Sequence, residues 1–127
     1  MLRDIIVDSH FPDCPIRNIL TRISDRWSML ILLTLNGKQE PMRYSDILAA
    51  IPDISQKMLT VALKNLEADG LVERHAFAEI PPRVEYRITE RAKTLMPHIN
   101  ALVEWALDNL ADILNDRKKY ASNKKHQ

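Results

Sequence analysis

The stretch from Ile51 to Gly70 constrains the fold of this chain more than any other segment. Pro52 ends a preceding helix near Ile51, because proline lacks a backbone N–H and disfavours helical angles in the residue before it. Ser55 is a favourable N-cap for a new helix, and Gly70 is a favourable residue just beyond its end. Between them, apolar residues recur at intervals of three and four, which predicts an amphipathic helix. Its buried face comprises Leu59, Ala62, Leu63 and Leu66.

The opposite face of this predicted helix, residues 55–69, is polar and cationic. It comprises Gln56, Lys57, Thr60, Val61 and Lys64. A short helix, a tight turn and a second helix with such a face form a helix-turn-helix, whose second helix enters the major groove of DNA. There, amide and hydroxyl groups bond base edges, an aliphatic group contacts a thymine methyl, and lysines contact guanine or phosphate. From composition alone, a solvated helix face is an equally good interpretation.

A β-hairpin is predicted directly after this helix. Residues 71–78 have the β-branched and aromatic content of a strand, and residues 84–88 alternate with Val84, Tyr86 and Ile88 on one face. The loop 79–83 contains two prolines, and Arg83 at its end is placed to reach a phosphate or the minor groove. A helix-turn-helix followed by a hairpin is a winged helix. The predicted fold class is therefore mainly α with a small β-hairpin wing (α+β), and residues 42–44 are predicted to pair with the wing.

Two further helices are predicted before this motif. Cys14 is the N-cap of the first and Pro15 its first helical residue, because proline is well tolerated at that position. Asp25 caps the second helix, which Asn36-Gly37 ends. Its central stretch, residues 29–35, is almost continuously apolar, which predicts a helix buried on all sides.

The helix before Pro52 is predicted to have Ser45 as its N-cap, with Ile47, Leu48 and Ile51 facing inward. After the wing, Thr89 caps a terminal helical region that Pro97 kinks or divides.

Apolar residues of the first and last helices predict a homodimer. From Ile99 to Ile113 they repeat at intervals of four and three, like a coiled-coil seam. Docking of this helix on its own domain is the competing interpretation. A twofold protein matches a palindromic operator. The predicted interface residues are Ile16, Ile19, Leu20, Ile99, Leu102, Val103, Ala106, Leu110 and Ile113.

The chain resembles the HxlR family of bacterial transcriptional regulators, distant relatives of the MarR group. The motifs that carry the resemblance are Cys14-Pro15, Asp25-Arg26-Trp27, residues 43–47, 54–60, 63–74 and 81–89, and Trp105. They span about residues 13–110 and depart from the family at Ala92, where its members have glycine. The resemblance implies a homodimeric winged-helix regulator that binds operator DNA. The DNA-binding residues expected on this basis are Arg43, Ser55, Gln56, Lys57, Thr60, Val61, Lys64 and Arg83.

Cys14 is a candidate sensor of oxidants or electrophiles. A cysteine at a helix N-terminus is stabilised as thiolate, and Arg17 lies one turn further on. Some members of the family sense such compounds through the cysteine at this position. Because the chain has one cysteine, its chemistry is limited to an intersubunit disulfide, a mixed disulfide with a small thiol, or alkylation. The alternatives are a small-molecule effector, or a cysteine with no signalling role.

The charge balance supports a second function class. The net charge is +1, and residues 43–93 contain eight cations and eight anions, so a DNA-binding surface requires segregation of the cations onto one face. The alternative is a winged-helix protein-interaction module without specific DNA binding.

The sequence does not support metal binding, catalysis or cofactor binding. Four scattered histidines predict no metal site, and we find no catalytic constellation and no cofactor motif. No apolar run is long enough to span a membrane, and residues 1–6 include Arg3 and Asp4 and no apolar signal-peptide region, which predicts a cytoplasmic protein. The predicted organisation is an arm at residues 1–12, a winged helix-turn-helix with its dimerisation helices at 13–115, and a polar disordered tail at 116–127.

Overall fold

A computed structural model describes residues 14–125 of the chain. They belong to two compact units that divide between Thr94 and Leu95. The predicted arm at residues 1–12 lies outside the described residues.

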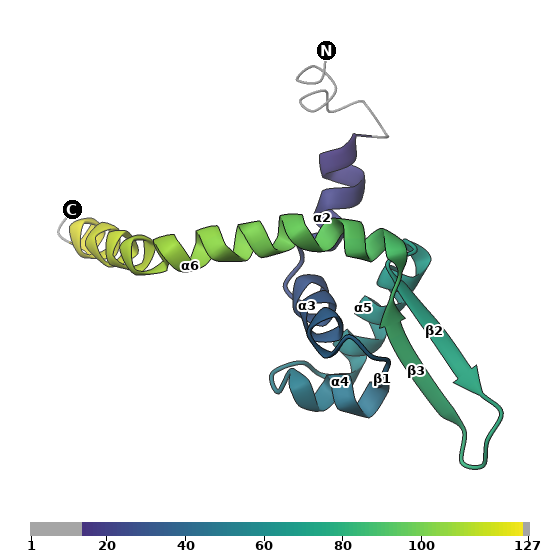
Figure 1. The fold of residues 1–127 in the computed structure, drawn as a ribbon. Helices are drawn as coiled ribbons and strands as arrows, with labels where there is room; N and C mark the ends of the chain where they lie inside the picture. The colour runs from purple at the N-terminus through teal and green to yellow at the C-terminus, as the bar shows by residue number, and fades with distance from the viewer. Residues whose placement is uncertain (1–13, 126–127) are drawn as a thin grey trace. The chain divides into compact units, whose positions relative to one another are not determined.

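The first unit contains short helices and a small sheet, which confirms the predicted fold class (Figure 1). The hairpin of β2 and β3 projects beyond the helices α3, α4 and α5 as a wing. In chain order the elements are η1 (Ile16–Leu20), α2 (Thr21–Ile23), α3 (Ser28–Lys38), β1 (Met42–Arg43), α4 (Tyr44–Ala50), α5 (Gln56–Ala68), β2 (Val72–Phe77), β3 (Arg83–Ile88) and the start of α6 (Glu90–Lys125).

The sheet is antiparallel, in the order β1-β3-β2. Met42 pairs with Tyr86 and Arg43 with Glu85, which confirms the short strand predicted ahead of the helix-turn-helix for two of its three residues. The third, Tyr44, begins α4 instead. In the hairpin, Val72 pairs with Ile88 and Phe77 with Arg83. The loop has the predicted length but is shifted by one residue, to residues 78–82. Arg83 is the first residue of β3 and not part of the loop, because it pairs with Phe77 at the end of the ladder.

The predicted amphipathic helix is confirmed at both ends and along its buried face. The Ser55 hydroxyl accepts a hydrogen bond from the Met58 N–H at 3.1 Å. At the other end, Gly70 has φ 74°, and the Gly70 and Leu71 N–H groups donate to the carbonyls of Glu67 and Leu66. This is a Schellman C-terminus, in which glycine avoids the steric penalty of the left-handed region. The four predicted core residues Leu59, Ala62, Leu63 and Leu66 are buried.

The helix α3 begins as predicted but differs from its prediction in its end and in its burial. Asp25 caps its start, because the Asp25 carboxylate accepts hydrogen bonds from the Trp27 and Ser28 N–H groups at 2.8 and 2.7 Å. The helix does not end at Asn36-Gly37 but continues to Lys38, and Gln39 closes it with φ 56°. It is not buried on all sides either: Ile31, Leu32 and Leu35 are buried, whereas Leu30 is exposed. Other elements cover only part of its circumference.

The predicted capping role of Ser45 is wrong. The helix α4 begins at Tyr44, with Arg43 as N-cap, and the Asp46 carboxylate accepts the Arg43 N–H at 3.1 Å. The helix starts this early because β1 pairs with β3 only as far as Arg43.

The terminal helix α6 is longer than predicted. Thr89 caps it as expected, since its hydroxyl accepts the Ala92 N–H at 3.1 Å. Pro97 lies inside α6 without dividing it, and the helix continues to Lys125 through the segment predicted to be a disordered tail. No Gly or Pro follows Pro97, and the residues after it are mostly good helix formers. Within residues 14–125, no helix is long and apolar enough to cross a membrane.

Candidate nucleic-acid interface

The exposed face of α5 is the face expected to contact DNA. Gln56, Lys57, Val61 and Lys64 are exposed, and Thr60 is half-buried. Met58 is also exposed (47%), although the sequence analysis did not include it. The Ser55 hydroxyl is engaged in the helix cap, so its first role is to position the start of α5.

Tyr44 fixes α5 to the preceding helix of the motif. Its hydroxyl donates to the Gln56 carbonyl at 2.8 Å and is 3.0 Å from the Thr60 hydroxyl. These contacts fix the start of α5 and restrict the rotamer of Thr60. This role of Tyr44 has no signature in the sequence, because the residues are 12 and 16 positions apart and no local periodicity relates them.

Two cations of the wing, Arg83 and Arg87, are paired within the wing itself. The Arg83 guanidinium lies 3.3 Å from Glu79 and 3.6 Å from Glu85, and it stacks 4.0 Å from the centroid of the Phe77 ring. Arg87 donates to Glu73 at 2.7 Å. To reach a phosphate as predicted, Arg83 has to leave these partners. The loop instead presents the fully exposed side chain of Ile80.

The cations around α5 are arranged differently. Within residues 14–125, Arg43, Lys57, Lys64 and Arg74 form no ion pair, and all four are exposed. Lys64 and Arg74 line one recess of about 430 Å³, together with Tyr44, Thr60, Leu63, Glu67 and Tyr86. The balanced charge of residues 43–93 is therefore segregated. Carboxylates pair with Arg83 and Arg87 in the wing, whereas α5 and its surroundings, including Arg74 of β2, keep unpaired cations. Arg74 is a candidate that the sequence analysis missed.

Cys14 lies just before helical angles begin at Pro15, which is where the sequence predicted it. Its carbonyl accepts the Asn18 N–H at 2.9 Å, and its side chain is buried. Hydrogen bonding by the backbone of Arg17 lowers the pKa of the Cys14 thiol, burial opposes this, and the Ile16 backbone and the Arg17 charge act in the same direction as the first cause. The environment therefore favours thiolate, as expected for the start of a helix.

The helix that follows Cys14 is connected to the end of α5. Arg22 in α2 donates from Nε to the Asp69 carboxylate at 2.7 Å, and this contact raises the pKa of Arg22. Asp69 is the C-cap residue of α5. This ion pair therefore joins the first helical segment to the end of α5.

Most of the predicted dimer residues expose apolar surface. In η1, Ile16, Ile19 and Leu20 are between 40% and 55% exposed. Along α6, Leu102, Ala106 and Leu110 are exposed and Val103 and Ile113 half-buried. Ile99 differs, because it is buried within the single chain. Trp105, Leu107 and Leu114 are exposed apolar residues that the predicted set left out.

Among the described residues, no group of three or more His, Cys, Asp or Glu side chains is arranged to hold a metal ion.

Known proteins match most of the chain. A model of the family described as HxlR-like helix-turn-helix matches residues 22–113. An uncharacterized HTH-type transcriptional regulator of Methanothermobacter thermautotrophicus is 42% identical over 92 residues, which are 72% of this chain and 69% of the relative. Among solved structures, the redox regulator HypR in its reduced form matches with a TM-score of 0.71 and 33% identity, over 80% of this chain and 98% of HypR. The reduced transcriptional regulator YodB from B. subtilis matches with a TM-score of 0.64 and 35% identity, over 75% of this chain and 89% of YodB. Oxidised HypR and diamide-treated YodB match as well.

Proposed function

Because this chain belongs to the HxlR-like helix-turn-helix family of transcriptional regulators, we propose that it binds operator DNA as a homodimer, with α5 of each subunit in a major groove. Two such helices related by a twofold axis fit half-sites about one helical turn, or a small multiple of it, apart.

The observation that carries the proposal is the segregation of charge. Arg43, Lys57, Lys64 and Arg74 surround the recognition helix without an intramolecular ion pair among the described residues. Cations of this kind position a protein on DNA by contacting phosphates, whereas base edges are read by hydrogen-bonding and apolar groups. On α5 those groups are Gln56, Thr60 and Val61. Ser55 and Arg83 remain expected contacts, after release from the cap and from the wing carboxylates respectively.

The homodimer is supported by the apolar residues that two helices leave exposed or half-buried. Ile16, Ile19 and Leu20 form one group, and Leu102, Val103, Ala106, Leu110 and Ile113 form the other. Monomeric proteins rarely expose large continuous apolar patches, and such patches mark interfaces. A dimer also doubles the number of cations available to DNA.

The test is a titration of the purified protein on the DNA that flanks its own gene, by fluorescence anisotropy at several salt concentrations. Phosphate contacts make log K fall with log salt, by about 0.9 for each neutralised phosphate. The variant Lys64→Gln should weaken binding and lower this slope by about 2 for a dimer, since one contact is lost per subunit. The control Lys118→Gln, in the second unit, should leave both quantities unchanged.

The signal is proposed to act on Cys14. Its lowered pKa and the matches with the redox regulators HypR and YodB support a response to oxidants or electrophiles. Treatment with diamide should then release the DNA in the wild type but not in Cys14→Ser. Release in both proteins would exclude Cys14 as the sensor.

The second candidate, a protein-interaction module, is favoured only by the low net charge of +1. It requires that affinity for nucleic acid be low at every salt concentration. If no sequence in a genomic library is bound preferentially, the regulator proposal fails and this module takes its place.

A further inference from the structure

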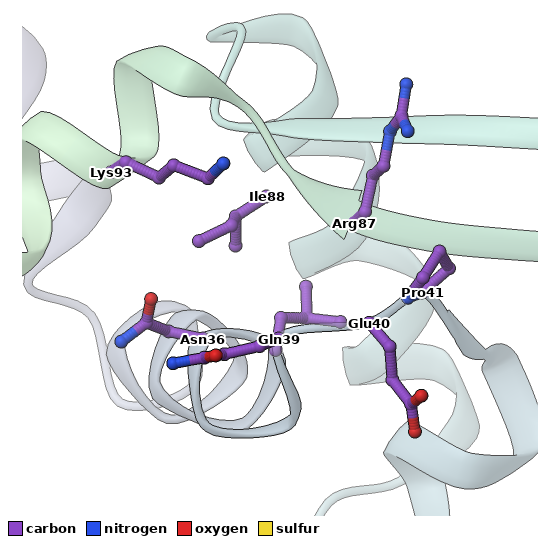
Figure 2. A pocket seen from close by; sticks show the side chains of 8 residues that line it. Asn36, Gln39, Glu40, Pro41, Arg87, Ile88 and Lys93 are labelled. Atoms are coloured by element: carbon purple, nitrogen blue, oxygen red, sulfur yellow. The ribbon is translucent and has the colours of Figure 1, made fainter.

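We propose that a small organic monocarboxylate binds in a recess beside the wing, which we call the α3–wing recess. Eight residues line it: Leu35, Asn36, Gln39, Glu40, Pro41, Arg87, Ile88 and Lys93 (Figure 2). Its volume is about 490 Å³, within the range of pockets that hold small molecules.

The polar groups of the recess point to the chemistry of the ligand. In Figure 2 the amides of Asn36 and Gln39 and the ammonium of Lys93 lie toward one end, and the Glu40 carboxylate extends away at the other. Among the described residues, neither amide makes a side-chain hydrogen bond. Lys93 Nζ donates to Glu90 at 2.9 Å, and an ammonium group has two further donors. One cation and two amide donors suit a single carboxylate.

The remaining lining accommodates an apolar body. Leu35, Pro41 and Ile88 supply hydrocarbon surface from α3, the following turn and β3. The other cation of the lining, Arg87, is paired with Glu73, so the recess offers no second cation to another carboxylate. The recess therefore favours a monoacid with an aromatic or alicyclic ring over a diacid or a neutral polar compound.

The backbone at the edge of the recess gives independent support. Gln39 has φ 56°, the only positive φ of a non-glycine residue in the part of the chain that the structure describes. A residue in this left-handed region at the end of a helix is usually glycine, and strained backbone is concentrated at functional sites. Here Gly37 lies inside α3, and a glutamine that lines the recess takes the strained position.

A ligand in this recess touches segments that position the DNA-binding elements, so a regulatory role follows if the proposed function holds. Pro41 precedes β1, whose residue Met42 pairs with Tyr86 of the wing. Two residues further on, the Tyr44 hydroxyl bonds the Gln56 carbonyl in α5. Arg87 and Ile88, on the opposite side, belong to β3. The bound acid would thus tie the base of the wing to the segment that leads into the helix-turn-helix.

The site is tested without DNA, by two-dimensional NMR of ¹⁵N-labelled full-length protein titrated with benzoate and, as the uncharged counterpart, benzamide. Saturable shifts are expected for amides in segments 35–41 and 87–93, with benzamide at least about tenfold weaker because it lacks the charge-assisted bond. Lys93→Met should weaken benzoate binding by about the same factor, and the control Lys118→Met should not. The Gln39→Gly protein should also bind benzoate more weakly, because it lacks the amide. It should remain folded, because glycine relieves the backbone strain at this position.

Each outcome decides between the proposals. No saturable shift with benzoate, equal shifts with benzamide, or affinity unchanged in Lys93→Met would overturn the site. Specific DNA binding by a protein that fails this titration would leave the proposed function intact. Localised benzoate shifts in a protein that binds no DNA would support the site and refute the regulator. When both hold, benzoate should change the operator affinity of the wild type but not of Lys93→Met.

Discussion

The two glycines of the chain allow a matched test of how the recognition helix is terminated. Gly70 has φ 74°, and a Cβ placed there would run into the Arg91 guanidinium. No heavy atom lies within 4 Å of a Cβ added to Gly37, which sits inside α3. The same substitution, glycine to alanine, should therefore have opposite effects at the two positions.

The magnitudes follow from the local geometry. At position 70, alanine in the left-handed region costs about 1 kcal/mol or more. Arg91 must also move, which disturbs its 3.0 Å bond to the Asp69 carbonyl, an exposed contact worth less than about 1 kcal/mol. Gly70→Ala should destabilise the fold by about 1–2 kcal/mol, which lowers Tm by roughly 4–8 °C. Gly37→Ala should stabilise it by about 0.5–1 kcal/mol, because alanine loses less backbone entropy in a helix.

The assay is thermal unfolding followed by circular dichroism, at one fixed protein concentration because association would make Tm depend on it. Destabilisation by both substitutions would refute the assignment of Gly37 to a helix interior. An unchanged Tm in Gly70→Ala would refute the requirement for a left-handed residue at the end of α5.

Three further outcomes are expected. Tyr44→Phe removes the hydroxyl that bonds Gln56 and Thr60, so it should cost about 1 kcal/mol in urea unfolding and weaken operator binding; unchanged DNA affinity would mean that this contact does not position α5. Leu110→Glu should shift the monomer–dimer equilibrium toward monomer in sedimentation velocity, since it places a charge on the proposed interface, whereas Lys118→Glu should not; identical sedimentation of both variants and the wild type would exclude Leu110 from the interface. Alkylation of Cys14 by iodoacetamide should show its pH midpoint below that of the urea-unfolded protein, because the folded environment lowers the pKa of the thiol; equal midpoints would contradict that effect.

Features set by neighbouring residues were predictable from the sequence. The helix α5 is an example, because Ser55, Gly70 and the apolar spacing between them act within one helix. Thr89 and Asp25 cap their helices for the same reason, since each bonds an N–H group three residues further on. Such short-range hydrogen bonds leave a signature of residue type and spacing.

Apart from the pairing of β1 with the wing, features that depend on long-range contacts were not predictable. The partners of Arg83 are fixed by a hairpin register that only the folded wing defines. The Tyr44 contact with α5 requires the turn between the two helices to be in place. Leu30 resembles Leu32 in the sequence, yet one is exposed and the other buried, because burial depends on which elements pack around α3. Gln39 and the length of α6 show that a local stop signal such as Gly37 or Pro97 is overridden when neighbouring residues still favour helix.

The distribution of charge links the fold to a quantitative expectation for DNA binding. If Arg43, Lys57, Lys64 and Arg74 each neutralise one phosphate, a dimer makes about eight contacts, and the slope of log K against log salt is about −7. The wing adds to this only if Arg83 and Arg87 leave Glu79, Glu85 and Glu73. Their release in the complex would raise the count to about twelve and the slope to about −11. A slope near −7 that is unchanged by Arg83→Gln would mean that the wing stays internally paired on DNA. A steeper slope that falls by about 2 in Arg83→Gln would show that the wing exchanges its own carboxylates for phosphates, so that its acidic residues set the affinity by competing with DNA.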